Sequence, residues 1–572
     1  MAPTPVPTAV AASPRETRLR WKEIQRQGPQ DAPGAPRLKI ALLASYTVDP
    51  LIPYLGVALR DAGLHPVLQT SPYNQIVQEC LNDASGTASF APDVLVVSPR
   101  LEELWAGRSF PERPDSGSGG PAGAVDDLLD VLDTALAAAA RWNSALLVVL
   151  PPVPDDLLAV VGDDNHPGGL AAAAAAAREH VRARVVGEPN AYVVDLEGVL
   201  RSVGTTRAHH PALYAHAKIP YTEEVFAALG ARIGRTLRLR FGDTGRAVAL
   251  DLGSLAEDAT EADALVPLVR RLNAGGIPVH VRGDRSTVRL WRALVTADCP
   301  LPSMVADWVF DDRPVPEQIR AIAAREGVPA GQVVLVGRDP AVLTAPAGQP
   351  PAPARAGSPL ALGPDPDHWT AELTAAALFD RLPEPAAGPG AGPGAAMFAA
   401  DRPRTSSGGL SLDSFVADLR AEVEFSAARD THVEKIAEMM FRTKDFTLGA
   451  VLEREQLTAA LADEEREVFV GTVRDRFGDF GLSVAVVLRF AAALCTVEAL
   501  LVSCPVMGKG VEEAVLHRIA DLAADRGCAT IRVDYRTTGR NQVAVDFFAS
   551  ARDRHWGAPD APAPVIDPVP VS

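Results

Sequence analysis

The sequence predicts a multidomain α/β protein in which two doubly wound parallel-sheet domains precede an α+β domain. The chain has 572 residues, and one hydrophobic core seldom serves more than roughly 250–300. Over the first two thirds of the chain, apolar runs alternate with amphipathic helical segments, which is typical of parallel sheets. Stretches rich in proline and glycine separate these patterned blocks and mark the domain boundaries.

The first block, residues 38–243, opens with LKIALLASYT, which predicts a buried strand ending in small polar residues. A helix is predicted over 51–62, and the strands HPVLQT, DVLVVSP, SALLVVLPP and NAYVVDLEGVL follow in order. Ahead of this block, residues 1–37 are polar and proline-rich, and only 17–27 favour a helix. PERPDSGSGGPAG, at 111–123, is short enough to be a loop inside the domain.

The second block, residues 244–382, repeats the alternation. RAVALDLGSL predicts a strand ending at Asp251, followed by a helix over 264–274, the strand IPVHVRG, a helix over 315–326 and the strand QVVLVGRDP. Proline, alanine and glycine dominate 345–366 and again the linker at 383–410. Because no core can be built from that composition, we expect the linker to be a flexible tether.

The third block, residues 411–557, has a helix over 431–442 and then the strands REVFVGTVRD, LSVAVVLRF and VEALLVS. A helix over 510–526, the strand ATIRVDY and a helix from Gln542 complete it. Antiparallel strands followed by a β–α–β unit predict an α+β domain. The proline-rich end, 558–572, is expected to be a tail.

Charge and cysteine content exclude several classes of function. The 72 acidic and 55 basic residues leave a net charge of −17, which argues against binding to nucleic acid and to anionic membranes. Five cysteines, an odd number, argue against a disulfide scaffold and for a reducing compartment. No apolar run is long enough for a membrane span and no signal-peptide pattern begins the chain, so we expect a cytoplasmic protein.

In the first block, candidate polar residues follow the predicted strands. Ser45 comes directly after the first strand, and the helix that follows offers N-terminal amides to an anion. Asn74 follows the second strand, and three histidines lie further on, His209, His210 and His216. Their convergence would indicate esterase chemistry. The simpler interpretation, which we favour, is that Ser45 caps a helix and the histidines pack or face solvent.

In the second block, a strand ending in Asp251 would suit a phosphotransfer site in which a carboxylate attacks phosphorus. Such a site needs Mg²⁺ and therefore several carboxylates. Gly253 stands where a second acid would be needed, and Arg338 follows the later strand. We therefore expect no metal in this domain.

The richest motif of the third block is LLVSCPVMGKGVEEAVLHRIA. Gly508 and Gly510 lie between a strand and a helix, where backbone amides could cradle a pyrophosphate or phosphopantetheine phosphate, and Lys509 adds a positive charge. Cys504 at the strand end is either an acyl-carrying nucleophile or a small buried hydrophobe. We interpret Cys495 and Cys528 as ordinary buried cysteines.

Together these motifs resemble the FkbH-like family, over about residues 38–557. IALLASYTVDPLIPYL, PYNQIVQE and YAHAKIPYT resemble its N-terminal signatures, and RTKDFTL, VRDRFGDFGL, LLVSCPVMGKGVEEAVL and TGRNQVAVDFF its C-terminal ones. The resemblance implies an SGNH-hydrolase-like region, a HAD-like phosphatase region and a GNAT-like acyltransferase region. It also implies an acyl-carrying thiol at Cys504, with Asn541 and Phe548 where a GNAT-like fold closes around an acyl-pantetheine.

The departures from the family pattern fall mainly in the HAD-like region. Its first motif would read DLDNTLW, and DLGSLAE retains only a vestigial Asp251. Gly283 and Val315 stand for the motif serine and lysine, and Gly337 and Arg338 for the metal-binding acids. We therefore expect an inactive HAD-like domain. In the GNAT-like loop, Pro505 replaces the usual arginine, which weakens the expectation of tight CoA binding.

Three functions are consistent with the resemblance. The first is an acyltransferase of natural-product, polyketide-type biosynthesis that moves an acyl group between a phosphopantetheine thioester, on an acyl carrier protein or CoA, and a small-molecule acceptor. The second is the usual reaction of the family, in which a glyceryl unit from 1,3-bisphosphoglycerate is loaded on an acyl carrier protein. The third is a catalytically silent scaffold that binds carrier proteins. We favour the first.

Overall fold

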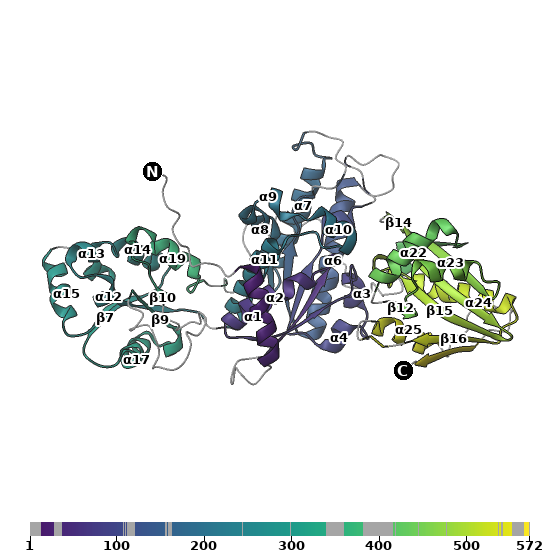
Figure 1. The fold of residues 1–572 in the computed structure, drawn as a ribbon. Helices are drawn as coiled ribbons and strands as arrows, with labels where there is room; N and C mark the ends of the chain where they lie inside the picture. Colours follow the sequence, from purple (N-terminus) through teal and green to yellow (C-terminus); the bar gives the residue numbers. More distant parts are fainter. Residues whose placement is uncertain are drawn as a thin grey trace, which may run out of the picture.

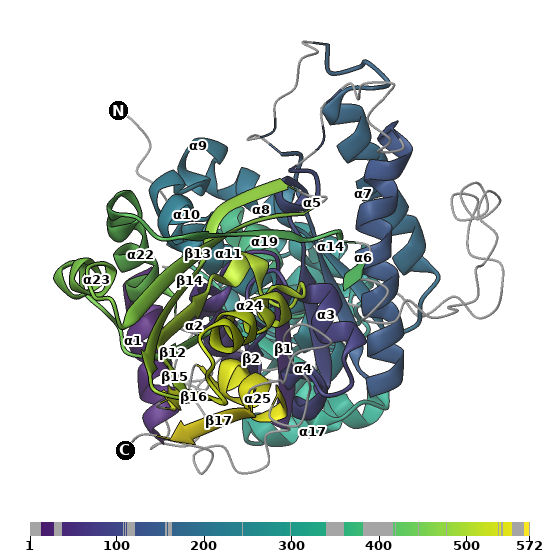
Figure 2. The same cartoon turned by 90° about the vertical axis from the view of Figure 1, so that its right-hand side faces the viewer.

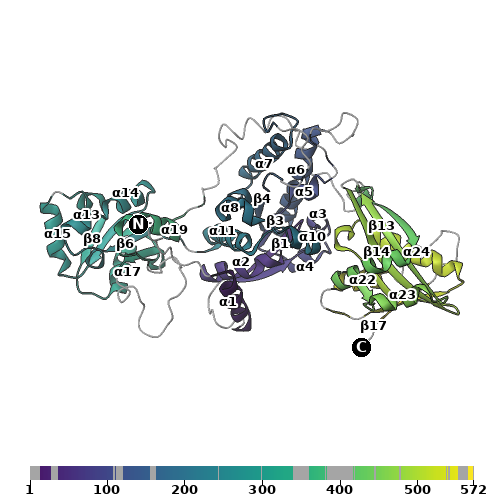
Figure 3. The same ribbon diagram turned by 45° about the horizontal axis from the view of Figure 1, so that its top comes forward.

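In the computed structural model the chain forms three α/β domains, each built around its own sheet (Figure 1). The first domain lies between the other two in the views of Figures 1 and 3. No helix within the described residues is long and apolar enough to cross a membrane. The structure describes residues 13–27, 37–106, 108, 110, 120–154, 157, 163–242, 244–297, 299–338, 360–380, 382, 416–417, 419–443, 446–475, 478–535, 537–538, 541–551 and 565–570.

The first domain is a five-stranded parallel sheet with the order β2-β1-β3-β4-β5, and helices cover both faces. Its β-strands are almost entirely apolar because both faces are buried. One face packs on α2, α8 and α11, and the other on α3, α6 and α7. The strands are β1 (Arg37–Ala44), β2 (His65–Thr70), β3 (Val94–Ser98), β4 (Ala145–Leu150) and β5 (Ala191–Asp195).

Two boundaries in this domain differ from the sequence prediction. The strand predicted over 190–200 ends at Asp195, whose side chain accepts a hydrogen bond from the Glu197 amide at 3.2 Å and so begins a helix. The predicted loop at 111–123 ends in α6, which starts at Gly120. The helices are α1 (Pro14–Gln27), α2 (Ile52–Asp61), α3 (Ile76–Leu81), α4 (Gly86–Phe90), α5 (Leu101–Leu104), α6 (Gly120–Trp142), α7 (Leu170–Val186), α8 (Leu196–Val203), α9 (Thr205–Ala208), α10 (Pro211–Ala217) and α11 (Glu223–Phe241).

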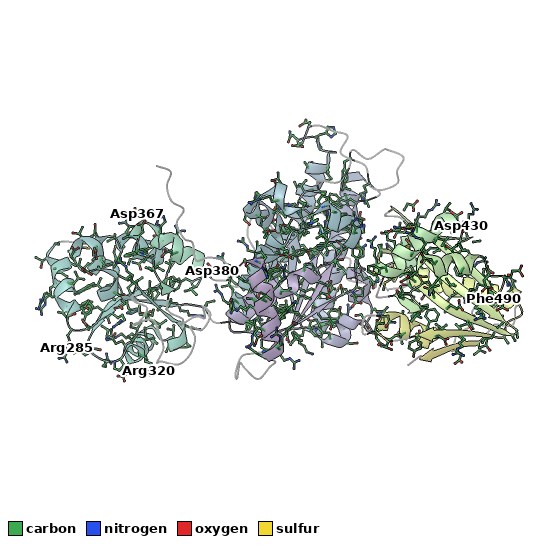
Figure 4. All side chains as sticks on the ribbon, in the orientation of Figure 1. Arg285, Arg320, Asp367, Asp380, Asp430 and Phe490 are labelled. Atoms are coloured by element: carbon green, nitrogen blue, oxygen red, sulfur yellow. The ribbon has the colours of Figure 1, made fainter. Side chains whose placement is uncertain are left out.

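The second domain is also a parallel sheet, in the order β10-β9-β6-β7-β8. Its strands are β6 (Ala247–Asp251), β7 (Val279–Gly283), β8 (Asp307–Phe310), β9 (Val333–Gly337) and β10 (Leu360–Ala361). Its helices are α12 (Leu252–Leu255), α13 (Ala259–Asp263), α14 (Val266–Ala274), α15 (Thr287–Thr296), α16 (Leu301–Met304), α17 (Val315–Glu326) and α19 (Trp369–Ala376). At the edge of this domain that faces the first domain, Asp380 forms an ion pair with Arg235 of α11 (Figure 4).

The third domain has a mixed sheet in the order β11-β13-β14-β15-β16-β17. Neighbours from β11 to β15 are antiparallel, and those from β15 to β17 are parallel. The predicted fold class is thereby confirmed. The elements are β11 (Glu422–Ala427), α22 (Asp430–Arg442), β12 (Thr447–Gly449), α23 (Arg454–Leu461), β13 (Arg466–Asp475), β14 (Gly478–Ala491), β15 (Leu494–Val502), α24 (Val511–Asp525), β16 (Thr530–Tyr535), α25 (Gln542–Ala551) and β17 (Val565–Pro570).

Two proline-rich segments in which no strand was predicted contribute strands. β17, within the predicted tail, pairs in parallel with β16 and buries Ile566 in the core. It is an edge strand, where proline is tolerated because its missing amide can face away from the ladder. β10, within the proline-rich stretch 345–366, pairs with β9, and the adjacent Leu362 is buried. The linker predicted at 383–410 lies outside the described residues.

Candidate functional site

The winding of the first sheet reverses between β1 and β3, and polar side chains gather at the carboxyl ends of these strands. Open parallel sheets bind ligands at such a point. Ser45 follows β1, and its Oγ accepts a hydrogen bond from the Arg100 amide at 2.8 Å. The Tyr46 and Ser98 hydroxyls lie 2.8 Å apart. These bonds tie the segment after β1 to the segment after β3.

The predicted serine–asparagine–histidine group forms only in part. The backbone N–H of Asn74 donates to the Ala44 carbonyl at 3.1 Å, so Asn74 and Ser45 lie at one edge of the sheet, as predicted. Within the described residues, Ser45 makes no hydrogen bond to a histidine. His210 caps α10 through Nδ1, and His216 presents its carbonyl to the third domain. The geometry therefore gives Ser45 a structural role.

Beside Ser45 lies a buried charged cluster, which we define as Arg100, Glu102, Glu103 and Tyr214. Arg100 is 1% exposed and pairs with Glu102 at 2.8 Å and Glu103 at 3.1 Å. The Tyr214 hydroxyl donates to Glu103 at 2.8 Å, and the Arg100 guanidinium stacks over its ring. Burial raises the pKa of Glu103 to about 7, although Arg100 opposes the rise. The cluster was not predicted; its signal in the sequence is three charged residues within five positions after a buried strand.

The charged cluster faces the third domain. Helices α3, α4 and α10 lie on that side of the first domain in Figures 1 and 3, and Figure 2 shows the third domain in front of them. Arg442 of α22 donates to the His216 carbonyl at the end of α10, the helix that carries Tyr214. A Cβ on Gly508 would lie 3.6 Å from the Gln75 side chain. The loop after β15 therefore contacts the turn that precedes α3.

Cys504 lies in this loop, at the start of the 3₁₀ turn Cys504–Val506 that joins β15 to α24. It is half-buried, whereas Cys495 and Cys528 are buried in the core, as predicted. Burial raises the pKa of Cys495 to about 12 and also raises that of Cys528. The two buried thiols are therefore poor nucleophiles at neutral pH.

The predicted phosphate cradle is occupied by side chains of the protein itself. The Gly508 amide donates to Glu512 Oε1 at 2.7 Å, so a carboxylate takes the position of an anion. Lys509 pairs with Asp475 at 2.7 Å, and its ammonium lies over the Phe480 ring. A phosphate held by Gly508, Lys509 and Gly510 would have to displace Glu512. The cofactor role of these three residues remains a prediction.

Glu512 should make the stability of the third domain depend on pH. Burial raises its pKa from 4.5 to about 7, so the folded state holds the proton more tightly than the unfolded state. The contribution of Glu512 to the free energy of unfolding is then greatest below pH 4.5, and it falls by roughly 3 kcal/mol as the pH rises to about 7. Glu512→Gln keeps the acceptor for Gly508 and should flatten this dependence in urea unfolding at pH 5 to 8. Glu464→Gln, at an exposed position just before β13, should leave the slope of wild type unchanged, whereas an unchanged slope in Glu512→Gln would contradict the prediction.

The sheet of the third domain forks beyond Val497, and β12 fills the fork. β15 pairs with β16 over 494–497, but with β12 over 499–501. The Val502 amide donates to the Phe446 carbonyl, and the Ala450 amide to the Glu498 carbonyl. An extended ligand adding to this edge of β15 would need the same backbone groups.

Asn541 fixes β12 in the fork. Its Nδ2 donates to the Thr447 carbonyl at 3.1 Å, and its Oδ1 accepts from the Thr538 amide at 2.9 Å. Asn541 is 3% exposed, and Phe548 on the adjacent helix is buried in the core. These contacts show Asn541 joining three segments of the domain; a catalytic role for it remains a prediction.

In the second domain, Asp251 is neutralised by an arginine. The carboxylate lies 2.9 Å from Arg282, which in turn donates to Gln318 at 2.7 Å, and all three side chains are buried. Arg282 belongs to β7 and directly precedes Gly283. Among the described residues, no group of three or more His, Cys, Asp or Glu side chains could hold a metal ion.

Neither family models nor curated proteins match this chain. One similar solved structure is the N-terminal part of BF1531 from Bacteroides fragilis, containing a phosphatase domain complexed with Mg: 15% identity, 63% of this chain, 98% of that chain, TM-score 0.47. Another is the ribosomal-protein-S18-alanine N-acetyltransferase from Escherichia coli: 14% identity, 19% and 64% coverage, TM-score 0.16. A third is the Trypanosoma brucei acetyltransferase Tb11.01.2886: 12% identity, 23% and 93% coverage, TM-score 0.18. With TM-scores below 0.5, these likenesses carry no argument about function.

Proposed function

We propose that this chain is an acyltransferase of natural-product, polyketide-type biosynthesis, and that Cys504 carries the acyl group. The observation behind the proposal is the position of this thiol. It is half-buried at the end of a central strand, in a loop that contacts the first domain beside a buried charged cluster. A half-buried thiol at such a contact is accessible to a substrate from solvent.

The reaction would proceed in two halves. The Cys504 thiolate attacks the carbonyl carbon of a thioester, a new C–S bond forms, and the C–S bond to the donor breaks so that the donor leaves as a thiolate. A nucleophile of the acceptor then attacks the Cys504 thioester and releases the thiolate of Cys504. The proton lost by the acceptor goes to the departing sulfur or to solvent.

We infer that the acyl donor is a phosphopantetheine arm on an acyl carrier protein rather than free CoA. Glu512 already binds the Gly508 amide, and Lys509 is paired with Asp475. A CoA pyrophosphate would therefore meet a carboxylate instead of a free amide, whereas a carrier-bound arm can leave its single phosphate outside the loop. The acceptor would be a small molecule or a second carrier.

Glyceryl loading from 1,3-bisphosphoglycerate is less well supported. It requires phosphate release in the second domain, where the Asp251 carboxylate is buried against Arg282. A carboxylate in that pair is shielded from a phosphorus centre and from Mg²⁺. We therefore propose that the second domain takes no chemical part in the transfer.

The test is intact-mass measurement of the full chain after incubation with a panel of acyl-carrier and acyl-CoA thioesters. We expect one acyl adduct on wild type, none on Cys504→Ser and an unchanged adduct on Cys299→Ser, which removes the other half-buried thiol. Absence of an adduct on wild type, or its persistence in Cys504→Ser, would overturn the proposal. Carrier binding without any adduct would instead support a silent scaffold.

A further inference from the structure

The turn between β2 and α3 brings Tyr73 to the contact between the first and third domains. Asn74 adopts a left-handed conformation, with φ of 55°, and its amide is bonded to the Ala44 carbonyl, which fixes the turn to the end of β1. Two residues after Tyr73, the Gln75 side chain packs against Gly508. Tyr73 is thus held beside the loop that carries Cys504, and it is half-buried.

The surroundings of Tyr73 link the two domains electrostatically. Burial raises its pKa well above the usual value, and the nearby Glu103, Tyr214 and Cys504 add to the rise. These groups come from both domains, which agrees with the contact of the turn of Tyr73 with the loop of Cys504 through Gln75 and Gly508. At neutral pH its hydroxyl keeps its proton and is a hydrogen-bond donor.

Resting on the proposed function, we propose that Tyr73 is a catalytic residue that the first domain supplies to the thiol of the third. As the Cys504 thiolate attacks the thioester carbon, the carbonyl π electrons move onto oxygen, and the Tyr73 hydroxyl donates a hydrogen bond to that oxygen. When the tetrahedral intermediate collapses, the C=O bond re-forms and the donor sulfur leaves. Tyr73 retains its proton throughout, so the step consumes no other reactant.

The place of Tyr73, in the turn that meets the loop of Cys504, suits such a donor. A group placed before the reaction and kept neutral stabilises the developing oxyanion without reorganising, which is how fixed donors accelerate acyl transfer. The Arg442 contact to α10 holds the third domain against the helix of Tyr214, so the two halves of the site keep a fixed relative position. The active site would then exist only where the two domains meet.

The experiment is a single-turnover measurement of adduct formation on the full chain by intact mass, with Tyr73→Phe. We expect the rate to fall by about 10²–10³-fold, the range for loss of one oxyanion donor, while the final adduct on Cys504 and the melting temperature are unchanged. The control is Tyr192→Phe, which removes another half-buried tyrosine hydroxyl of the first domain, on β5. It should react as wild type does.

The outcomes separate the two proposals. An adduct on wild type with a Tyr73→Phe rate within threefold of it would overturn the role of Tyr73 and leave the role of Cys504 standing. No adduct on wild type would overturn both. To exclude a general disturbance of the loop, the rate of Cys504 alkylation by iodoacetamide is measured in the same variants. A parallel loss of alkylation in Tyr73→Phe would show a structural effect and would also overturn the catalytic role.

Discussion

Replacing Lys509 with methionine should lower the free energy of unfolding of the third domain by about 3–5 kcal/mol, the usual effect of leaving one partner of a buried ion pair. The Lys509 and Asp475 side chains are 5% and 0% exposed and lie 2.7 Å apart. Methionine keeps the length of the side chain and its contact with the Phe480 ring, so the loss reports the removal of the ammonium group from the buried Asp475 carboxylate. Hydrogen exchange of peptides from β13 and α24 measures this loss of stability in the third domain alone.

Two controls isolate the charge effect. In Lys509→Met with Asp475→Asn, neither charge of the pair remains, and most of the lost stability should return. Lys435→Met breaks the exposed pair with Glu438, which should cost less than about 1 kcal/mol. A loss in Lys509→Met no larger than in Lys435→Met would show that Lys509 is free in solution, and would restore it as a phosphate-binding residue.

Gly449→Ala should destabilise the third domain by about 2–5 kcal/mol, the sum expected for a left-handed residue and for overpacking. Gly449 has φ of +78°, and an added Cβ would collide with the Glu498 carbonyl of β15. Because both atoms belong to backbone segments held by hydrogen bonds, neither can move without opening the fork. Peptides from β12 and β15 should therefore exchange faster than in wild type.

Gly481→Ala is the matched control, since Gly481 has φ of +61° but nothing within 4 Å of an added Cβ. It should cost only about 1–2 kcal/mol, from backbone strain alone. If the two variants lose equal stability, β12 does not occupy the fork in solution. The edge of β15 would then be open to an extended ligand such as a pantetheine arm.

Local patterns in the sequence were sufficient for most of the elements. α17 and β13 begin and end at the residues predicted, because apolar side chains recur about every 3.6 residues along a helix and a compact apolar run, 468–470, marks the strand. β10 and β17 were missed, since β10 has only two residues, β17 contains two prolines, and the pairing of both depends on β9 and β16. A strand that is stabilised by its neighbour leaves little trace in its own composition.

The candidate residues show the same division. The sequence alone determined two parallel α/β domains and an α+β domain, a single acid at the end of the strand of Asp251, and a cysteine and two glycines between a strand and a helix. Only the tertiary structure decided which charges meet: Asp251 with Arg282, Lys509 with Asp475, and the Cys504 loop with the turn of Tyr73. The physical reason is that periodicity is a property of neighbouring residues, whereas ion pairs and domain contacts join side chains that are distant along the chain and become close only when it folds.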